Sequence, residues 1–394
     1  MKIFHVTNGI EWSGGMEQIS LLIAEIKKKS HENHLACPPG SKLIERLAPL
    51  KIDITQISMR QDYDLIAAWK IRGLVQSLRP DIVHTHHAIA HAVTLVALTG
   101  LKRPPLVVSR RVSFSPRKNP FSRWKYGSSR IDAYSVVSRS VKETLVQGGV
   151  RPEKIHVIYS ALDPKRFENL PPISQIKKSL QVPEGVKIIG KLANYSLWKG
   201  QYVFLQAASI CLEKRKDLIF LLIGKDTENL KGEVEKLEVA NSVKILGFRA
   251  DAPQILSILD VSINSAIEGE GLSGAMRESL ALGIPVIATG VAGNREIVRD
   301  GETGWIVPPS DPQGLAKKIL EVLENPVPGK EMAQRGRKWV LENATAEKMT
   351  SDLLGLYQSL LQRTPNPRLF RLTCLAGRRV GGQVGGQAEP RTPI

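Results

Sequence analysis

The chain has 394 residues, 42% of them hydrophobic, and a formal net charge of +17 at pH 7. A chain of this length and apolar content forms two or three packed domains, which excludes an intrinsically disordered protein. The three cysteines, Cys37, Cys211 and Cys374, are odd in number and far apart. Their spacing excludes a disulfide-stapled scaffold and indicates a reducing compartment.

The amino-terminal apolar run is interrupted by His5 and Asn8, so we expect no signal peptide and a cytoplasmic protein. The most apolar helical stretch, residues 88–101, is too short to span a bilayer. The positive charge favours one of three partners: nucleic acid, an anionic membrane face or phosphorylated small molecules. Residues 362–394 hold six arginines and one glutamate, so most of the charge belongs to the folded body.

Short β-rich runs alternate with amphipathic helical runs in the first half of the chain. The predicted strands and helices, in chain order, are 3–6, 16–28, 82–85, 87–97, 107–108 and 133–137. This alternation is typical of repeated βαβ units that build a parallel sheet.

A polar segment with four prolines, residues 163–185, interrupts the alternation and is predicted to link two domains. The alternation then restarts with predicted elements at 187–192, 201–213, 218–223, 228–239, 243–246, 252–259 and 261–264. Residues 219–223 are apolar throughout, as in a strand covered on both faces. Later helices are predicted at 315–324, with Asp311 as its cap, at 330–341 and at 346–361. We expect a ligand cleft between the two domains, at the carboxyl ends of the strands.

Glu270 and Glu278 belong to the segment that carries the most chemical information. A glycine-rich loop follows the strand ending at Asn264, and a helix is predicted over 273–282. The free N–H groups at the start of that helix suit a diphosphate, and carboxylates accept hydrogen bonds from vicinal sugar hydroxyls. The pattern therefore indicates a nucleotide-sugar site. The alternative interpretation is a capped loop with ordinary surface acids.

This segment resembles the E-x7-E signature of glycosyltransferase family 4, the retaining enzymes of GT-B fold, because seven residues separate Glu270 from Glu278. The resemblance implies that Glu278 holds the ribose hydroxyls and that Glu270 holds the transferred sugar. The end of the glycine-rich loop and the start of the following helix, Gly271, Leu272 and Ser273, would complete the donor site.

Further segments resemble the same family in the same order, over about residues 1–361. The loop with Gly14 and Gly15 is similar to the family's Gly-Gly-x-Glu loop, which approaches the diphosphate or the acceptor. It lacks the G-x-G-x-x-G spacing of dinucleotide enzymes, although a plain strand-to-helix turn is the alternative. The other matching segments are 80–86, 157–163 and 293–304.

Residues 190–200 resemble the family's donor-phosphate motif, with Lys199 in the lysine position. Its ammonium would neutralise the departing diphosphate; the alternative is a solvated lysine before a helix. Asn194 stands where an arginine is common in the family, so the diphosphate has one cation fewer unless Lys191 substitutes for it.

Arg111 falls near the position where many family members carry a catalytic-site histidine. Arginine cannot act as a base at neutral pH, so we expect Arg111 to orient an acceptor phosphate or to steady the leaving group. His86, at the end of a predicted strand, is predicted to face the acceptor or the donor from the cleft.

No metal site is predicted. His84, His86, His87 and His91 are close in sequence, but no carboxylate or cysteine cluster accompanies them. The Asp62-Tyr-Asp64 pattern precedes a predicted helix, so helix capping is the expected role.

Residues 102–130 hold nine basic side chains and no acid, with four aromatic residues interleaved. The cations are Lys102, Arg103, Arg110, Arg111, Arg117, Lys118, Arg123, Lys125 and Arg130. An exposed loop and short helix of this composition suit an anionic membrane or a phosphorylated, lipid-linked acceptor. A solvated basic face is the alternative, and nucleic acid is disfavoured because no recognised binding module accompanies the stretch.

The resemblance thus implies a GT-B fold of two Rossmann-like βαβ domains facing a central cleft. We expect an N-terminal acceptor domain (1–165), a C-terminal nucleotide-sugar domain (166–345), a helix returning to the N-terminal domain (346–361) and a disordered basic tail (362–394). The implied activity is retaining, metal-independent glycosyl transfer without a cofactor. Envelope polysaccharide or lipopolysaccharide assembly, at the inner face of the plasma membrane, is the expected setting. The alternatives are a nucleotide-sugar epimerase or hydrolase, or a basic non-enzymatic protein that binds membranes or nucleic acid.

Overall fold

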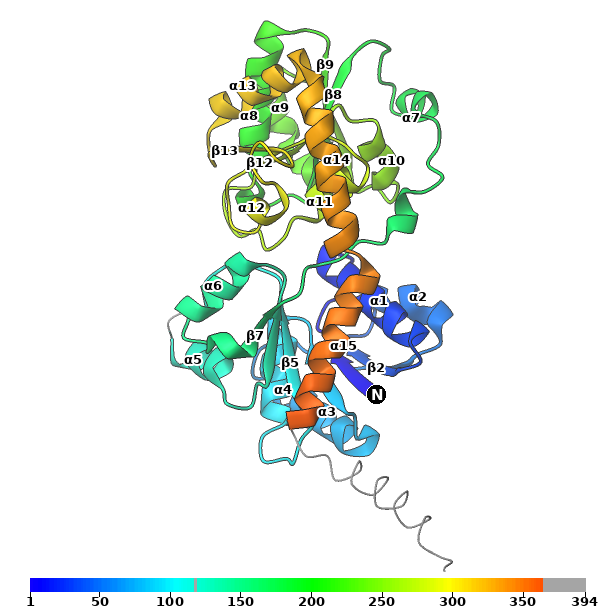
Figure 1. Ribbon diagram of the computed structural model, residues 1–394, viewed down its shortest axis with the longest axis vertical. Helices are drawn as coiled ribbons and strands as arrows, with labels where there is room; N and C mark the ends of the chain where they lie inside the picture. The colour runs from blue at the N-terminus through cyan, green and yellow to red at the C-terminus, as the bar shows by residue number, and fades with distance from the viewer. Residues whose placement is uncertain (117–118, 364–394) are drawn as a thin grey trace, which may run out of the picture.

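The computed structural model describes residues 1–116 and 119–363. The chain forms two lobes, each built on a parallel β-sheet flanked by helices (Figure 1). The predicted pair of Rossmann-like domains is therefore confirmed. Residues 364–394, most of the predicted basic tail, lie outside the described residues, as do Arg117 and Lys118.

The N-terminal lobe contains a seven-stranded sheet in the order β3-β2-β1-β4-β5-β6-β7. Its strands are β1 (Lys2–Val6), β2 (Glu32–Cys37), β3 (Asp53–Gln56), β4 (Ile82–Thr85), β5 (Leu106–Arg110), β6 (Ala133–Val136) and β7 (Ile155–Val157). Its helices are α1 (Gly14–Lys28), α2 (Lys42–Leu47), α3 (Leu65–Leu78), α4 (Ala88–Ala97), α5 (Pro120–Gly127) and α6 (Arg139–Gln147).

The C-terminal lobe contains a six-stranded sheet in the order β10-β9-β8-β11-β12-β13. Its strands are β8 (Lys187–Leu192), β9 (Leu218–Ile223), β10 (Val243–Gly247), β11 (Val261–Asn264), β12 (Val286–Thr289) and β13 (Trp305–Val307). Its helices are α7 (Ile173–Ser179), α8 (Gln201–Lys214), α9 (Lys231–Lys236), α10 (Ala252–Ser257), α11 (Gly274–Ala281), α12 (Asn294–Ile297), α13 (Pro312–Glu324) and α14 (Pro326–Asn343).

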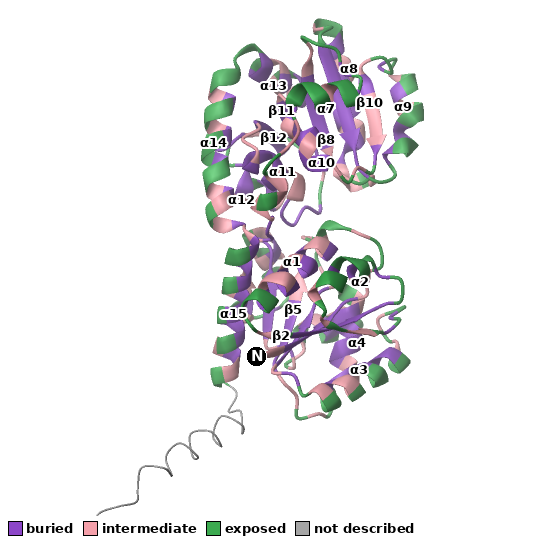
Figure 2. Cartoon of the chain, turned by 90° about the vertical axis from the view of Figure 1, so that its right-hand side faces the viewer, coloured by how far each residue is buried: buried purple, intermediate pink, exposed green. Residues whose placement is uncertain are grey.

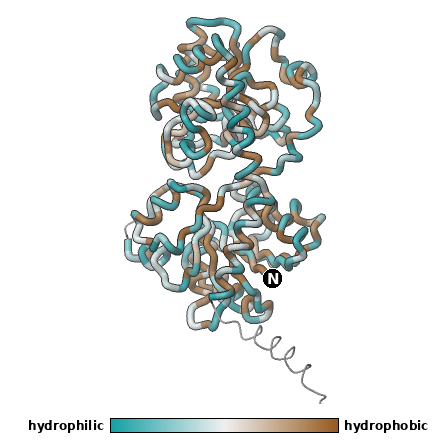
Figure 3. Tube along the Cα trace, in the orientation of Figure 1, coloured by the Kyte–Doolittle hydropathy of each residue, from teal (hydrophilic) through white to brown (hydrophobic). Residues whose placement is uncertain are grey.

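Both sheets are covered on their two faces, so the strands form the centre of each lobe. Every residue of β9, Leu218–Ile223, is buried, as the absence of alternation predicts. Buried residues run along the strands and the inner sides of the helices, while the outer helical surfaces are exposed (Figure 2). Short hydrophobic and hydrophilic stretches alternate along the chain in both lobes (Figure 3).

The last two helices connect the lobes. Helix α14 packs on the C-terminal lobe against α11, and α15 (Ala346–Arg363) packs on the N-terminal lobe against α1. Tyr357 of α15 is fully buried, and its hydroxyl lies 2.6 Å from Nδ1 of His84 in β4. This polar contact and the apolar cluster around it hold the end of the described chain on the first sheet.

The proline-containing segment 163–185, which the sequence predicts to link the two domains, is partly helical. It contains a short 3₁₀ helix, Pro164–Phe167, and the seven-residue helix α7. Pro172 precedes the first residue of α7 and does not interrupt it. Ile176 and Leu180 are buried in the C-terminal lobe, which explains why this segment is helical.

Within residues 1–116 and 119–363, no helix combines the length and the hydropathy that crossing a bilayer requires.

Candidate active site

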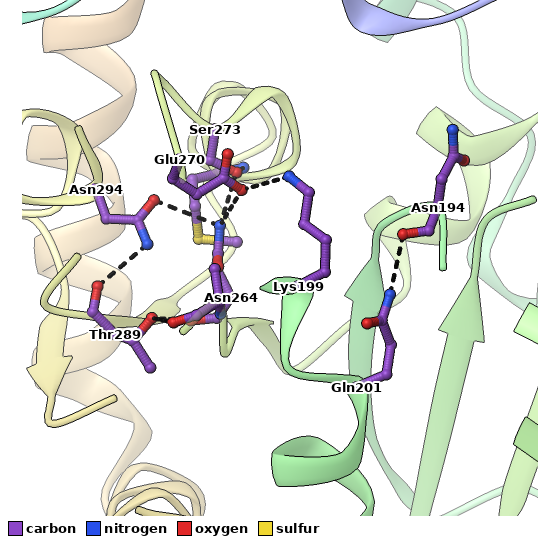
Figure 4. Close-up of polar contacts among 10 residues, drawn as sticks. Asn194, Lys199, Gln201, Asn264, Glu270, Ser273, Thr289 and Asn294 are labelled. Carbon is purple, nitrogen blue, oxygen red and sulfur yellow. Dashed lines mark hydrogen bonds and ion pairs between the residues drawn. The ribbon is translucent and has the colours of Figure 1, made fainter. Parts of the chain in front are cut away.

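The loop between β11 and α11 carries Glu270 and is held by a network of hydrogen bonds (Figure 4). Asn264, the last residue of β11, donates through Nδ2 to Glu270 Oε1 at 3.2 Å and to Ser273 Oγ at 2.9 Å. Ser273 caps α11, since its Oγ also accepts from the N–H of Met276 at 3.4 Å. These bonds fix Glu270 near the start of α11, whose free N–H groups favour an anion.

Lys199 forms an ion pair with Glu270. The distance from its Nζ to Glu270 Oε1 is 2.7 Å, and the two side chains are 21% and 8% exposed (Figure 4). The turn after Lys199 requires glycine, because Gly200 has a φ of +67° and a Cβ there would lie 1.9 Å from the carbonyl oxygen of Ser265. The structure therefore brings two predicted site residues from distant segments into direct contact.

Asn194 and Lys191 differ in their relation to this ion pair. The side chain of Asn194 is exposed, and its Oδ1 accepts from the N–H of Lys225 at 3.0 Å, so it joins the loops after β8 and β9. Lys191 is only 2% exposed. Burial, with the charge of Lys199, lowers the pKa of Lys191 to about 7, against the opposite effect of Glu270. Lys191 is thus a titratable cation close to the Lys199–Glu270 pair.

Glu278, in α11, contacts a residue that joins the two lobes. Nη1 of Arg166 lies 3.4 Å from Glu278 Oε1 and also forms an ion pair with Glu17 of α1. Burial, together with the charge of Glu17, raises the pKa of Glu278 to about 7, while Arg166 acts in the opposite direction. Glu278 therefore changes charge near neutral pH.

A cleft of about 860 Å³ lies between the lobes, and both Glu278 and Arg166 line it. The other lining residues come from both lobes: Glu11, Trp12, Glu17, Lys42, Glu45, Arg46, Leu192, Asn194, Ile223, Gly224, Lys225, Phe248, Arg249, Ala250 and Ala252. A cleft of this volume suits a nucleotide-sized ligand. Glu270 and Lys199 are not among the lining residues, so the two predicted acids differ in their access to the cleft.

Gly14 and Gly15 begin α1, next to the N-terminal wall of the cleft. Trp12 and Glu17, on either side of these glycines, line the cleft. A Cβ on Gly15 would lie 3.2 Å from Nε2 of His87, whereas a Cβ on Gly14 would have no neighbour within 4 Å. The backbone at Gly14 is therefore open to a ligand.

His86 belongs to a buried chain of hydrogen bonds that ends at Arg111. His5 Nε2 lies 3.0 Å from Oδ1 of Asn33, and His5 Nδ1 lies 3.0 Å from His86 Nε2. Burial lowers the pKa of His5 to about 4 and holds the pKa of His86 well below its usual value, so both rings are neutral. Since the amide oxygen only accepts, His5 donates to Asn33, His86 donates to His5, and Arg111 donates to Nδ1 of His86 at 3.3 Å.

His86 and Arg111, although hydrogen-bonded to each other, differ in their access to a ligand. His86 is 2% exposed and both its ring nitrogens are bonded, so neither is free for an acceptor. The backbone of Arg111, in contrast, touches the loop of Glu270: a Cβ on Gly271 would lie 2.0 Å from the carbonyl oxygen of Arg111. The structure therefore places Arg111 against the donor-side loop and His86 behind Arg111.

The two lobes make further contacts on this side of the molecule. The ring of Phe114 meets the ring of Trp198 edge-on, with 5.8 Å between centroids. The N–H of Ser140 donates to Oε1 of Glu296 at 3.0 Å. The loop after β5 and the start of α6 thus pack directly on the C-terminal lobe.

His5, His84 and His86 are the one group of metal-ligand side chains found close together in residues 1–116 and 119–363. Hydrogen bonding accounts for all six ring nitrogens, because Nδ1 of His84 meets Tyr357 and its Nε2 lies 2.8 Å from Oγ of Ser109. These partners explain the cluster as a structural network.

Asp64 caps α3, since its Oδ1 accepts from the N–H of Ala67 at 3.0 Å. The expected capping role of this acid is confirmed. Asp62 has a different partner, because its Oδ1 lies 3.0 Å from Nζ of Lys125 in α5.

The basic stretch 102–130 is less exposed than the sequence predicts. Five of its cations have partners within the lobe. Arg103 binds Asp132, Arg110 binds Tyr126, Arg111 binds His86, Lys125 binds Asp62, and Arg130 binds the carbonyl of Leu98. Lys125 is only 4% exposed. The cations of this stretch therefore stabilise the lobe to a large extent instead of forming a free basic face.

Sequence reasoning did not identify Arg166, Asn264 or His5 as parts of this region. Arg166 is 149 residues from Glu17 and 112 residues from Glu278, so no local pattern connects the three. Asn264 had a usable signal, because it is the last residue of the strand that leads into the glycine-rich loop.

Two facing Rossmann-like lobes with a nucleotide-sized cleft between them define the GT-B class of glycosyltransferases. A model described as "Glycosyltransferase Family 4" matches residues 13–166, and one described as "Glycosyl transferases group 1" matches residues 172–339. The chain belongs to glycosyltransferase family 4 and is a glycosyltransferase.

Known proteins of similar sequence and structure agree with this assignment. N-acetyl-alpha-D-glucosaminyl L-malate synthase of Bacillus anthracis is 25% identical, over 88% of this chain and 93% of its own. The capsular polysaccharide biosynthesis glycosyltransferase CapM of Staphylococcus aureus is 23% identical, over 92% and 98%. The structure of Anabaena HepE in complex with UDP has a TM-score of 0.81 at 21% identity, over 91% of this chain and 100% of HepE.

Proposed function

We propose that this enzyme transfers a hexosyl group from a UDP-sugar to a hydroxyl of a saccharide acceptor, with retention of configuration and without a metal. HepE, of the same fold, has been observed with UDP and with UDP-glucose, which supports a UDP-sugar donor. The observation that carries the proposal is that Glu270 lies before the start of α11 and is paired with Lys199, while Glu278 of the same helix lines the interlobe cleft.

On the donor side, Glu278 would accept hydrogen bonds from the ribose hydroxyls in the cleft, and Glu270 would hold the sugar. The amides of Gly271, Leu272 and Ser273 directly precede α11 and would meet the diphosphate. Lys199 already forms an ion pair with Glu270, which holds its ammonium group beside the loop before a ligand binds. Lys191 would add the cation that Asn194 does not supply, because an anion nearby favours its protonated form.

In the reaction, the bond from C1 of the sugar to the β-phosphate oxygen breaks, and a bond from C1 to the acceptor oxygen forms on the same face. Lys199 would stabilise the charge that develops on the diphosphate. Neither Arg111 nor His86 suits the role of base: arginine stays protonated, and both nitrogens of His86 are bonded. We therefore assign the acceptor proton to an oxygen of the departing diphosphate.

The acceptor would approach from the N-terminal lobe, along Gly14, Gly15 and Arg111. A phosphorylated or lipid-linked saccharide suits this side, because Arg111 could orient a phosphate. CapM is named for capsular polysaccharide synthesis, and LpsE of Rhizobium meliloti, 25% identical over 46% of this chain, for lipopolysaccharide core synthesis. These names support a role in envelope polysaccharide assembly, and the location that belongs to this proposal is the cytoplasmic side of the membrane.

A thermal-shift panel of UDP-, GDP- and ADP-sugars, followed by NMR of the product anomer, tests this proposal. We expect UDP-sugars to raise the melting temperature most, EDTA to leave the rate unchanged, and the product to keep the donor's configuration. An inverted product would reject retention of configuration, and a metal-dependent rate would reject transfer without a metal. Rapid turnover without any acceptor would favour an epimerase or hydrolase instead. No shift with any nucleotide-sugar, together with a shift by oligonucleotides or liposomes, would favour a binding protein.

A further inference from the structure

Large apolar side chains lie exposed on two helices of the N-terminal lobe. Around the start of α3, the exposed fractions are 65% for Tyr63, 69% for Leu65, 72% for Ile66 and 74% for Trp69. On α5, Phe121 is 37% exposed and Trp124 is 42% exposed. We call these six residues the α3–α5 surface.

The helical period explains why α3 has two apolar sides. Its inner side, Ala67, Ala68, Ile71 and Val75, is buried against the lobe. Leu65, Ile66 and Trp69 project from the opposite side, which is exposed in the structure (Figure 2). Single exposed apolar residues are common, but a contiguous group of this kind marks an interaction site.

The two parts of the surface are neighbours. Asp62, next to Tyr63, forms the 3.0 Å ion pair with Lys125 of α5. A recess of about 350 Å³ has Asp62, Phe121 and Lys125 in its lining, so the residue before Tyr63 and the start of α5 share one hollow. The rings of Phe121 and Trp124 are in contact, with 5.5 Å between centroids.

The surface is also close to the interlobe side of the N-terminal sheet. Helix α3 follows the carboxyl end of β3, and α5 follows the carboxyl end of β5. The carboxyl ends of parallel strands share one edge. That edge faces the C-terminal lobe, because Arg111, directly after β5, touches Gly271. A partner bound at the α3–α5 surface would therefore lie near the edge where the acceptor is expected to enter.

Exposed cations accompany the apolar residues, and the nearby acids are engaged. Arg60, Lys70 and Arg123 are exposed. Asp62 is paired with Lys125, and Asp64 caps α3. The uncompensated charge around the surface is thus positive, as is the net charge of the chain.

We propose that the α3–α5 surface docks this enzyme on an anionic phospholipid bilayer. Tryptophan, tyrosine and aliphatic side chains beside lysine and arginine are the combination that binds a membrane interface, where the apolar groups enter and the cations meet the headgroups. Docking in this way would hold the acceptor side of the cleft at the membrane. The proposal deepens the membrane location given above and does not depend on the identity of the donor.

Flotation of the full-length protein with liposomes tests the proposal. Vesicles of phosphatidylcholine alone are compared with vesicles that contain phosphatidylglycerol, at low and high salt. The test variant is Ile66→Ser with Trp69→Ser, and the matched control is Ile173→Ser with Val327→Ser. The control residues are 53% and 60% exposed and lie on the C-terminal lobe. Since all four side chains are exposed, the melting temperature is expected to stay close to that of the wild type in both variants.

We expect the wild type to float with the anionic vesicles, less so at high salt, and the control variant to do the same. The test variant should lose at least about tenfold in partition coefficient, and Lys70→Gln with Arg123→Gln should lose less. The shift in melting temperature with UDP-glucose should be equal in all variants, which separates this proposal from the donor assignment. Equal flotation of wild type and test variant, or no flotation of the wild type, would overturn the proposal. A wild-type dimer that the test variant disperses would also overturn it and would assign the surface to a second copy of the chain.

Discussion

Nη1 of Arg166 and Oε1 of Glu278 lie 3.4 Å apart at the boundary between the two lobes. The same guanidinium binds Glu17 of the other lobe. Glu278 is therefore a buried acid with two cations, Arg166 and Arg277, and one anion, Glu17, close to it. Its pKa is raised to about 7 because burial and Glu17 outweigh the two arginines. A ribose bound by Glu278 has to share this carboxylate with Arg166.

The raised pKa of Glu278 predicts a donor affinity that depends on pH. The carboxylate is the better acceptor for two hydroxyls, and it becomes populated as the pH rises through about 7. Lys191 loses its charge over the same pH range, which would weaken donor binding. The measurement is therefore made in a Lys191→Met background, in which we expect the affinity for UDP-glucose to increase by about tenfold from pH 6 to pH 8 and then to level. Isothermal titration calorimetry across this range measures it, with Glu278→Gln as the control that should be weak and flat. An affinity that is equal at pH 6 and pH 8 in the Lys191→Met background would contradict the role of Glu278.

Removing the charge of Glu17 or of Arg166 should shift, in opposite directions, the pH at which the donor affinity is half-way between its low-pH and high-pH values. Without the negative charge in Glu17→Gln, the pKa of Glu278 should fall and the midpoint should move to lower pH. Without the positive charge in Arg166→Gln, the pKa should rise and the midpoint should move to higher pH. The same titration measures both variants. Displacement in one direction for both would show that the bridge acts through packing and not through charge.

The close approach of Gly271 to the carbonyl oxygen of Arg111 predicts that kcat depends on contact between the two lobes. A Cβ at this position would lie 2.0 Å from the carbonyl oxygen of Arg111, so Gly271→Ala must move the loop of Glu270 or part the lobes. We expect kcat to fall roughly 10- to 100-fold, because a misplacement of about 1 Å has that effect on positioned groups. The matched control is Gly232→Ala in α9, where a Cβ meets nothing within 4 Å. Steady-state kinetics decides, and an unchanged kcat in Gly271→Ala would mean that this contact is not part of the active state.

The contact of Tyr357 with His84 predicts how firmly α15 is bound. Tyr357→Phe removes the hydroxyl and leaves Nδ1 of a fully buried histidine without this partner. The expected loss in free energy of unfolding is about 1–3 kcal/mol, measured by urea denaturation. Tyr63→Phe, at a residue that is 65% exposed, is the control and should change little. If both variants unfold at the same urea concentration as the wild type, the Tyr357 hydroxyl does not stabilise the docking of α15.

The two parallel sheets could be predicted from sequence because their signal is local. Strands such as Leu218–Ile223 are continuous apolar runs, and the helices between them show a clear period. Helix α7 was missed, since the prolines around it indicate a linker. Its helical state depends on burial of Ile176 and Leu180 in the C-terminal lobe, which is tertiary information.

The candidate site could be predicted only where its residues are close in sequence or belong to a motif. Glu270, Ser273 and Glu278 share one loop and helix, so their spacing was informative. The partner of Glu278 could not be found in this way, because Arg166 reaches it across 112 residues. The basic stretch 102–130 was misjudged for the same reason: its cations bind groups such as Asp62 that are distant in sequence.

Direct titration of UDP-glucose into the wild type, Lys199→Gln and Glu278→Gln tests most directly whether Lys199 and Glu278 bind an activated sugar. Lys338→Gln, at an exposed lysine of α14, is the matched control. We predict that the wild type and the control bind alike and that each site variant loses at least about tenfold in affinity, or about 1.4 kcal/mol. Wild-type protein that binds no nucleotide-sugar, or site variants that bind as tightly as the control, would contradict the proposed donor site.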